Sequence, residues 1–185
     1  MILVLAAHPD DEVLGCGGTI NRLIRINADV VTVNIFSKGR KDPLDQYFDK
    51  YPIRYWITKI EKLVGTYLPM KVFTHHPNDL NRDHRIIYEA TRIACRSNTS
   101  VEEIYAYEVP TSVPTENFKP NFYVPLAEMD IKFKIDRMKT VYAKELRQFP
   151  HPRSVEGIRY LARVRGMECG SKYAEAFEMI WRVYL

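Results

Sequence analysis

Histidine and carboxylate side chains gather in two short stretches that lie far apart in this chain. The first stretch reads Ala7-His8-Pro9-Asp10-Asp11-Glu12, and the second runs from Thr74 to Arg85. Imidazole and carboxylate are ordinary zinc ligands, and a catalytic zinc site takes three protein ligands and keeps one position open for water. We expect His8, Asp11 and His84 to supply the three ligands.

Asp10 is the carboxylate that this ligand set leaves over. Because it is next in sequence to a ligand, it can lie within reach of a metal-bound water without binding the metal itself. Zinc lowers the pKa of its water toward about 7 and polarises a bound carbonyl, so a neighbouring carboxylate can take up the proton and pass it to a leaving amine. We therefore expect Asp10 to be the general base of an amide hydrolysis.

Both stretches directly follow predicted strands. The continuous apolar run over residues 1–7 predicts a buried strand before the first stretch, and a short strand at Lys71–Thr74 precedes the second. Strands alternate with helices along the chain, which favours an α/β fold with a mostly parallel sheet and helices on both faces. Ligands bind beyond the carboxyl ends of the strands in such sheets. The two stretches should therefore meet in one crevice.

The apolar spacing predicts the other elements as well. Further strands are expected at Val30–Phe36 and Ile104–Val109, and helices at about Gly17–Asn27, Ile53–Leu63, Asp83–Arg96, Glu128–Phe149 and Val155–Arg165. The Pro-rich connection between Pro110 and Pro125 should be irregular, because proline interrupts helices and donates no ladder hydrogen bond. Phe177–Leu185 fits a strand or a helix, and Asp79 or Asn81 could simply cap the helix that follows.

Composition limits the class of protein. A chain of 185 residues, with a hydrophobic fraction of 46% and a charged fraction of 27%, is expected to form one domain with a real core. The N-terminal apolar run has no basic residues before it, and no uncharged apolar run approaches the roughly 18 residues of a membrane span. We expect a cytoplasmic protein without a membrane span.

The charged residues and the cysteines exclude further classes. The formal charge of +4 comes from lysines and arginines spread along the chain, without the basic stripe of a nucleic-acid surface, so no nucleic-acid partner is expected. The charge mildly favours an anionic small-molecule substrate. Cys16, Cys95 and Cys169 are far apart and odd in number, which predicts neither a disulfide framework nor a thiolate metal site.

Three segments in order resemble the PIG-L/LmbE deacetylases. They are the first stretch continued by Gly15-Cys16-Gly17-Gly18, the stretch Thr74–Arg85, and the segment from His151-Pro152-Arg153-Ser154 to Ala174-Glu175-Ala176-Phe177. The resemblance covers nearly the whole chain and implies a single domain over residues 1–185 with a Rossmann-like three-layer fold. It also implies zinc-dependent removal of the N-acetyl group from an N-acetylated sugar or sugar conjugate. By matching position, the metal ligands and the base are the residues assigned above.

The chain departs from the family pattern at Asn81, where many members have a histidine that helps to stabilise the oxyanion. His151 is the substitute that we expect, since some relatives complete the site with a C-terminal histidine, occasionally from a neighbouring subunit of a homo-oligomer. The alternative is a histidine before a proline in a surface loop. Arg153 could hold a phosphate or a sugar hydroxyl, or face solvent. Asn81 and Arg153 are the candidates for substrate binding.

A second departure concerns length. Relatives usually carry an extra helix and strand after the segment that here ends near Gly39, so about one β-α unit is expected to be missing after about residue 40. This leaves open a catalytically silent sugar-binding or structural homologue that retains the metal motif. An iron oxygenase would use the same ligand types, but it explains neither the extra carboxylate Asp10 nor the α/β pattern.

Overall fold

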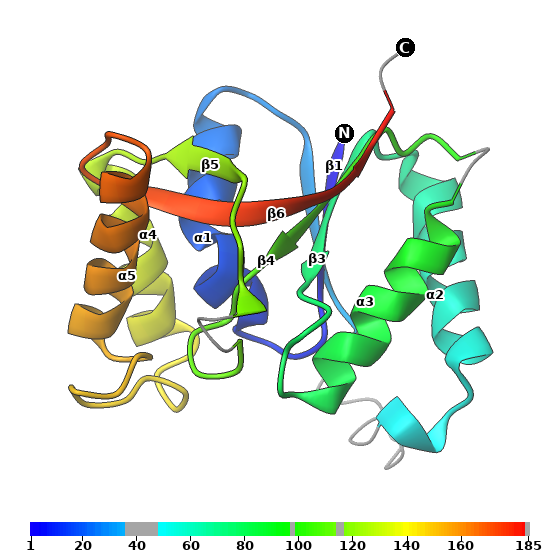
Figure 1. Cartoon of the computed structure of the whole chain (residues 1–185), viewed down its shortest axis with the longest axis horizontal. Coiled ribbons are helices and arrows are strands. Elements are labelled where there is room, and N and C mark those ends of the chain that lie inside the picture. The colour runs from blue at the N-terminus through cyan, green and yellow to red at the C-terminus, as the bar shows by residue number, and fades with distance from the viewer. Residues whose placement is uncertain (36–47, 97–98, 114–116, 184–185) are drawn as a thin grey trace.

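The computed structural model describes residues 1–35, 48–96, 99–113 and 117–183. In this part of the chain a six-stranded sheet, in the order β2-β1-β3-β4-β6-β5, lies between two layers of helices (Figure 1). The strands are β1 (Ile2–Ala6), β2 (Val30–Asn34), β3 (Lys71–His75), β4 (Glu103–Tyr107), β5 (Phe122–Pro125) and β6 (Ala174–Arg182). The helices are α1 (Asp11–Arg25), α2 (Ile53–Tyr67), α3 (Arg82–Ala94), α4 (Glu128–Thr140) and α5 (Val155–Glu168), with a short 3₁₀ helix, η2, at Phe48–Lys50.

The α/β class is confirmed, but the expectation of a mostly parallel sheet is wrong, because the sheet is mixed. β2, β1, β3 and β4 are parallel, whereas β6 is antiparallel to both of its neighbours, β4 and β5. Two helices, α4 and α5, separate β5 from β6. Leu126 N donates to Tyr173 O at 2.8 Å, so α4 starts beside the end of α5 and the two run in opposite directions. This antiparallel helix pair brings the chain back to the edge of the sheet at which β5 ends. β6 therefore starts beside the end of β5 and runs antiparallel to it.

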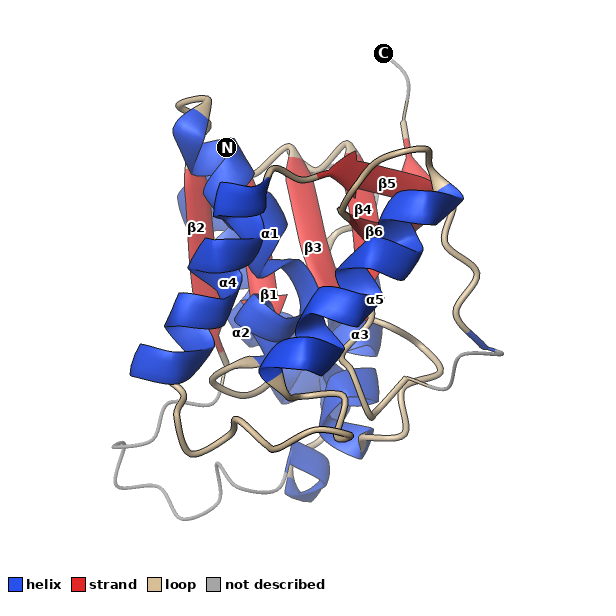
Figure 2. Cartoon of the chain, turned by 90° about the vertical axis from the view of Figure 1, so that its left-hand side faces the viewer, coloured by secondary structure: helices blue, strands red, loops and turns tan. Residues whose placement is uncertain are grey.

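Both faces of the sheet are covered by helices. Helices α2 and α3 pack on one face, and α1, α4 and α5 pack on the other (Figures 1 and 2). Because side chains alternate along a strand, Leu3 and Leu5 of β1 join Trp56 and Ile60 of α2, while Val4 joins the opposite core. This two-sided burial explains why the first strand is apolar at every position.

Helix α1 has a kink that a distant carboxylate caps. The backbone of Cys16 is not helical (φ −142°, ψ 22°), so the second part of α1 begins with free N–H groups. The carboxylate of Glu175, on β6, accepts hydrogen bonds from Gly18 N at 3.0 Å and from Thr19 N at 2.7 Å. Glu175 therefore acts as the N-cap of a helix more than a hundred residues away in sequence.

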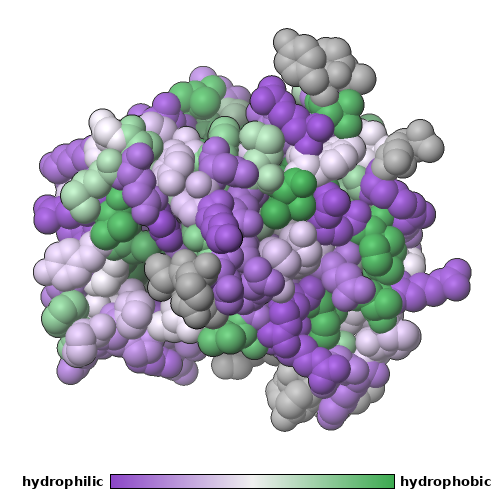
Figure 3. Space-filling model, in the orientation of Figure 1, coloured by the Kyte–Doolittle hydropathy of each residue, from purple (hydrophilic) through white to green (hydrophobic). Residues whose placement is uncertain are grey.

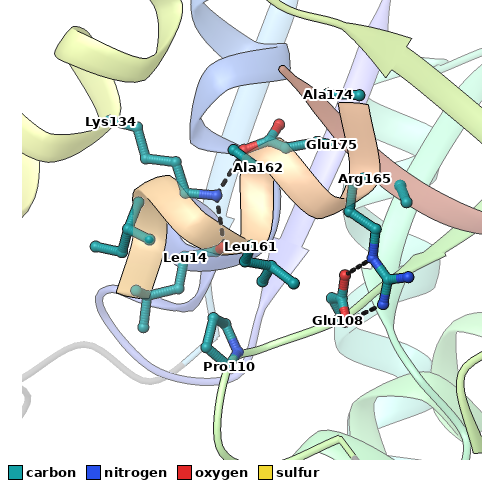
Figure 4. Close-up of a pocket in the computed structure, with 12 residues that line it drawn as sticks. Leu14, Glu108, Pro110, Lys134, Leu161, Ala162, Arg165, Ala174 and Glu175 are labelled. Atoms are coloured by element: carbon teal, nitrogen blue, oxygen red, sulfur yellow. Dashed lines mark hydrogen bonds and ion pairs between the residues drawn. The ribbon is translucent and has the colours of Figure 1, made fainter. Parts of the chain in front are cut away.

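A buried lysine completes the same arrangement. Lys134 Nζ, from α4, lies 2.7 Å from Glu175 Oε1 and donates to Leu14 O at 2.7 Å (Figure 4). The ion pair thus occupies backbone groups on both sides of the kink. Gly15 is needed here, because a Cβ at that position would lie 2.2 Å from the ring of Tyr107. The kink therefore fixes how the first turn of α1 is presented at the edge of the sheet.

Several sequence-based boundaries need correction. The helix expected over Glu128–Phe149 ends at Thr140, and the Pro-rich connection contains a strand, β5. The C-terminal segment is a strand from Ala174 to Arg182. The β-α unit expected to be missing after about residue 40 falls in residues 36–47, outside the described residues.

A membrane-spanning helix has to be both long and apolar. No helix in the described ranges is both long and apolar enough to cross a membrane. On the face drawn in Figure 3, hydrophilic residues run across the middle and hydrophobic residues lie in small separate groups. This face therefore offers no broad apolar surface.

Candidate metal and catalytic site

The two histidine-containing stretches meet at one edge of the sheet, as expected. β1 and β3 are parallel neighbours, so the segments that follow them leave the sheet at the same edge. His8 and Asp11 come from the segment after β1 and the start of α1, and His84 comes from the first turn of α3. Asp11 and His84 are buried, and His8 is partly exposed. Together these three side chains form a cluster that could hold a metal ion.

The three nearest polar atoms of this cluster form a triangle. His8 Nδ1 lies 3.5 Å from Asp11 Oδ2 and 3.4 Å from His84 Nε2, and His84 Nε2 lies 3.1 Å from Asp11 Oδ2. Two ligands of tetrahedral zinc, each about 2.0–2.1 Å from the metal, are about 3.3 Å apart. The triangle therefore has the size of one face of a zinc coordination tetrahedron, and the residues fit the metal.

Each histidine of the cluster is oriented by a carboxylate on its other nitrogen. His84 Nδ1 lies 2.7 Å from Asp79 Oδ2, and His8 Nε2 lies 3.0 Å from Asp83 Oδ2. Such partners fix the tautomer and direction of a metal-binding imidazole. Sequence reasoning gave Asp79 only a capping role and did not single out Asp83. The sequence feature that could have identified both partners is a carboxylate within a few residues before His84.

The electrostatics of the cluster favour positive charge on the two rings that face the Asp11 carboxylate. Burial opposes protonation of both rings, but hydrogen bonds to Asp11 and Asp83 outweigh it and raise the pKa of His8 to about 9. Asp11 and Asp79 likewise raise the pKa of His84 to about 9. Burial acts to raise the pKa of Asp11, yet its bonds to His8 and His84 hold that pKa well below the usual range. Asp11 is thus an anion that needs a cation beside it.

Asp10 adopts a backbone conformation that is rare for a residue with a side chain. Its φ is 101° and it is the N-cap residue of α1, but its side chain makes no capping hydrogen bond. The carboxylate instead lies 3.2 Å from Nη1 of Arg153. Burial and the charge of Asp11 raise the pKa of Asp10 to about 7, although Arg153 acts against the shift. Strained residues of this kind cluster at functional sites.

A cavity of about 620 Å³ opens beside the cluster. The loops after β1 and β3 form one side, and the segment Val141–Glu145, which follows α4, forms another. The lining residues are His8, Pro9, Asp10, Asp11, Asn81, His84, Val141, Tyr142, Ala143, Lys144, Glu145 and Arg153. The volume suits a small-molecule ligand. The helix expected to continue to Phe149 ends early, and its last residues become a wall of this cavity.

The other expected site residues are Asn81, Arg153 and His151, and they differ in what they contact. Asn81 lines the cavity, but its side chain caps α3 by accepting from Asp83 N at 2.9 Å. Arg153 lines the cavity and reaches Asp10. His151 Nδ1 accepts from Arg153 N at 3.1 Å, and within the described ranges no hydrogen bond joins His151 to Asp10. The structure therefore brings Arg153 to Asp10 directly and His151 only through the backbone of Arg153.

The adjacent histidines of the second stretch point in opposite directions. His75 lies under the cluster, where its ring stacks on His84 with centroids 3.9 Å apart and its Nε2 accepts from Ala7 N at 2.8 Å. Burial holds the pKa of His75 well below its usual value, so this ring is neutral. His76 lies on the other side, with its Nε2 3.0 Å from Glu178 but not aligned for a hydrogen bond.

Comparisons with known proteins support the resemblance that the motifs indicated. The family model described as "PIG-L: GlcNAc-PI de-N-acetylase" matches residues 3–47, which include the first stretch and the kinked part of α1. A curated relative, the "Uncharacterized deacetylase YaiS" of Escherichia coli K12, is 26% identical over 170 residues, 75% of this chain and 88% of that protein.

Solved structures share the fold over almost the whole chain. N,N'-diacetylchitobiose deacetylase from Pyrococcus horikoshii is 19% identical and covers 97% of this chain and 83% of its own, with a TM-score of 0.67. GalB, the 4-carboxy-2-hydroxymuconate hydratase of Pseudomonas putida, is 15% identical and covers 100% and 97%, with a TM-score of 0.68. The fold is thus shared by a deacetylase and a hydratase, so the reaction must be argued from the site.

Proposed function

We propose that this chain is a metal-dependent hydrolase of the PIG-L/LmbE type that removes the N-acetyl group from an N-acetylated sugar or sugar conjugate. The observation that carries the proposal is the triangle of His8 Nδ1, Asp11 Oδ2 and His84 Nε2, with sides of 3.1 to 3.5 Å. Its size suits three ligands of a tetrahedral divalent metal, for which we propose zinc. The match to the family model and the deacetylase relative support the reaction.

The residues around the cluster suit the proton transfers of amide hydrolysis. A metal held by the cluster would polarise the acyl oxygen and make water a stronger nucleophile at neutral pH. Asp10 lies beside the cluster without belonging to it, and a pKa near 7 lets its carboxylate accept a proton and then give it to the leaving amine. Arg153 holds this carboxylate and adds a positive charge to the cavity wall, which favours negative charge developing on the acyl oxygen.

The proposal also names the residues that contact the sugar. Asn81 and Arg153 line the cavity and are our candidates for contacts with the sugar. The role of His151 as an oxyanion donor stays a prediction, as do a cytoplasmic location and a homo-oligomer. The relative from Pyrococcus horikoshii is described as acting on N,N'-diacetylchitobiose, which favours an acetylated sugar as the small-molecule partner.

Metal content and acetate release test this function together. Purified protein should contain about one equivalent of a divalent metal per chain and release acetate from at least one member of a panel of free, nucleotide-linked and lipid-linked N-acetyl sugars. Asp10→Asn should keep the metal and lose acetate release by a factor of about 10² or more, because the general base is gone. The measurements are elemental analysis of the protein and an acetate assay.

The matched control is Asp49→Asn, which changes a carboxylate outside the cavity lining that pairs with Arg82 at 2.9 Å. It should change neither metal content nor rate. Protein that takes up no metal although its ligands are intact would refute the enzyme proposal. Bound metal without acetate from any sugar would favour the catalytically silent homologue.

A further inference from the structure

Glu12 joins two parts of the cavity that are far apart in sequence. Its side chain is buried, with 6% of its surface exposed, and lies in the first turn of α1. Oε2 accepts a hydrogen bond from Asp10 N at 3.2 Å, and Oε1 accepts one from the hydroxyl of Tyr142 at 2.6 Å. Each carboxylate oxygen therefore has a donor, one from each side of the cavity.

The hydrogen bond from Asp10 N to Glu12 stabilises an unfavourable backbone conformation of Asp10. A left-handed φ of 101° costs a non-glycine residue free energy and persists only where the surroundings hold it. The Asp10 side chain makes no capping bond, so it does not stabilise its own turn. Glu12 supplies the missing restraint by binding the Asp10 N–H from within the first turn. The Asp10 carboxylate is thereby left to face the cavity and Arg153.

The bond to Tyr142 fixes the opposite wall. Tyr142 follows the last turn of α4, and its ring packs against the core under α1. Val141–Glu145 lines the cavity but belongs to no helix or strand, so few backbone bonds define its position. Val141 N and Tyr142 N donate to Arg137 O at 2.9 and 3.3 Å and hold the start of the segment, while Glu145 N donates to Tyr142 O at 2.9 Å within it. The hydrogen bond from the Tyr142 hydroxyl to Glu12 ties this wall to the first turn of α1.

We infer that Glu12 is a positioning residue, which through Tyr142 fixes the distance between the Asp10 carboxylate and the Val141–Glu145 wall, and so places the bound acetamido group against the base. This inference rests on the proposed function. Misplacement of reacting groups by about 1 Å can cost a factor of about 10² in rate. The effect should therefore appear in kcat, without loss of the metal.

A set of four variants tests the inference. Tyr142→Phe removes one hydrogen bond, and Glu12→Ala removes both. Each should lower kcat about ten- to a hundredfold with unchanged metal content. Glu12→Gln should stay close to wild type, since its amide oxygen can accept from Asp10 N while its NH₂ donates to the Tyr142 oxygen. Tyr105→Phe is the matched control, because it removes a tyrosine–carboxylate bond of 2.7 Å to Glu103, at the opposite end of the strands.

The double variant separates positioning from direct catalysis by Tyr142. If Glu12 and Tyr142 act as one unit, Glu12→Ala combined with Tyr142→Phe should be no slower than Glu12→Ala alone. Additive losses would overturn the inference, because Tyr142 would then act on the substrate independently of Glu12. A wild-type kcat for Tyr142→Phe would also overturn it, and would leave the proposed function intact.

Amide hydrogen exchange gives a readout that does not need activity. Exchange of the peptide spanning residues 141–147 should be faster in Tyr142→Phe and Glu12→Ala than in wild type, and unchanged in Tyr105→Phe. If the wild type released no acetate, the proposed function would fail, while faster exchange would still support the tie between the wall and Glu12. Unchanged exchange in both variants would overturn the tie, whether or not acetate is released.

Discussion

At the scale of single residues, the cluster is built so that each imidazole turns one nitrogen toward an outer carboxylate and the other toward Asp11. Asp83 holds Nε2 of His8, which leaves Nδ1 facing Asp11, and Asp79 holds Nδ1 of His84, which leaves Nε2 facing the same carboxylate. The two rings therefore approach Asp11 through different nitrogens. The outer carboxylates choose the tautomers and so decide the geometry of the site.

Asp79→Asn should weaken metal binding without unfolding the protein. Asp79 also accepts from the hydroxyl of Ser112 at 3.0 Å, so its orientation is well defined, and an amide could keep that contact while losing the charge that supports His84. We expect the affinity for Zn²⁺ to fall about 10- to 100-fold, measured by competition with a chelator. Ser112→Ala serves as the control for the loss of a neighbouring hydrogen bond and should have a smaller effect. Equal affinities for wild type and Asp79→Asn would show that His84 needs no such support.

The residue types of the cluster could be predicted from the sequence, but their partners could not. His8 and Asp11 are close in sequence, and the strand edge brings His84 to them. The contact of Asp79 with His84 depends on how the chain turns between β3 and α3, which no periodicity encodes. The same holds for His151 and Arg153, since only the path of that turn decides which of two nearby side chains reaches Asp10.

At the scale of the elements, the kink in α1 depends on a charge pair brought from two other elements. Lys134 and Glu175 are both buried and lie 2.7 Å apart, and together they bind backbone groups on either side of Cys16 (Figure 4). Glu175 belongs to the C-terminal segment that resembles the family, and its role in the structure is to cap the kinked helix. Its carboxylate shapes the helix that carries Asp11.

Lys134→Met should lower the free energy of unfolding by about 3–5 kcal/mol, because it leaves the Glu175 carboxylate buried without its cation. The midpoint of urea unfolding measures the change. Lys172→Met is the matched control, since Lys172 pairs with Glu128 at 3.1 Å on the surface and should leave the midpoint almost unchanged. A small effect at Lys134 would mean that water replaces the lysine at the kink.

Asp130, in the first turn of α4, should make the protein sensitive to acid. Burial acts to raise its pKa, but the paired bonds from Arg25 and the bond from Ala127 N outweigh burial and lower the pKa. The stabilisation is therefore present above the unfolded pKa of about 3.9 and is lost as the pH falls through the lower folded value. Asp130→Asn should cost about 2 kcal/mol at pH 7 and progressively less below pH 4, by urea unfolding across pH. A cost independent of pH would exclude the charge as its origin.

The spacing of apolar residues predicts a helix well where the same packing repeats at every turn. It predicts the end of a helix poorly, because a single local contact can decide where the helix stops. The apolar spacing gave α2, α3 and α5 with errors only at their ends. The same spacing continues past Thr140 through Tyr142, but there the chain leaves the helix and the Tyr142 hydroxyl bonds to Glu12. Strand β5 was missed because the prolines around it argue against a ladder. It is an edge strand, where a missing N–H is tolerated.

At the scale of the whole molecule, the proposed metal would join two segments that the sheet alone only places side by side. The parallel direction of β1 and β3, which brings both segments to this edge, could be predicted from the sequence, whereas the order of the strands could not. The reversal of β6 could not, because it depends on α4 and α5 pairing as opposed helices. The four parallel strands position the cluster, while β6 acts on it at a distance through Glu175 and α1.

Metal binding should therefore raise the stability of the entire fold. A ligand at 100 times its Kd adds about 2.7 kcal/mol if it binds only the native state, which for a chain of this size corresponds to a rise in Tm of about 5–10 °C. We expect this rise on adding Zn²⁺ to the chelator-treated wild type and to Asp10→Asn, and its loss in Asp11→Asn, measured by thermal unfolding. The two adjacent residues have the same side chain and similar burial, with 3% and 1% of their surfaces exposed, so the pair controls for the loss of a buried carboxyl group. If the metal still raised the Tm of Asp11→Asn but no longer that of Asp10→Asn, Asp10 would be the ligand and Asp11 the base. Only a ligand can couple the metal to folding.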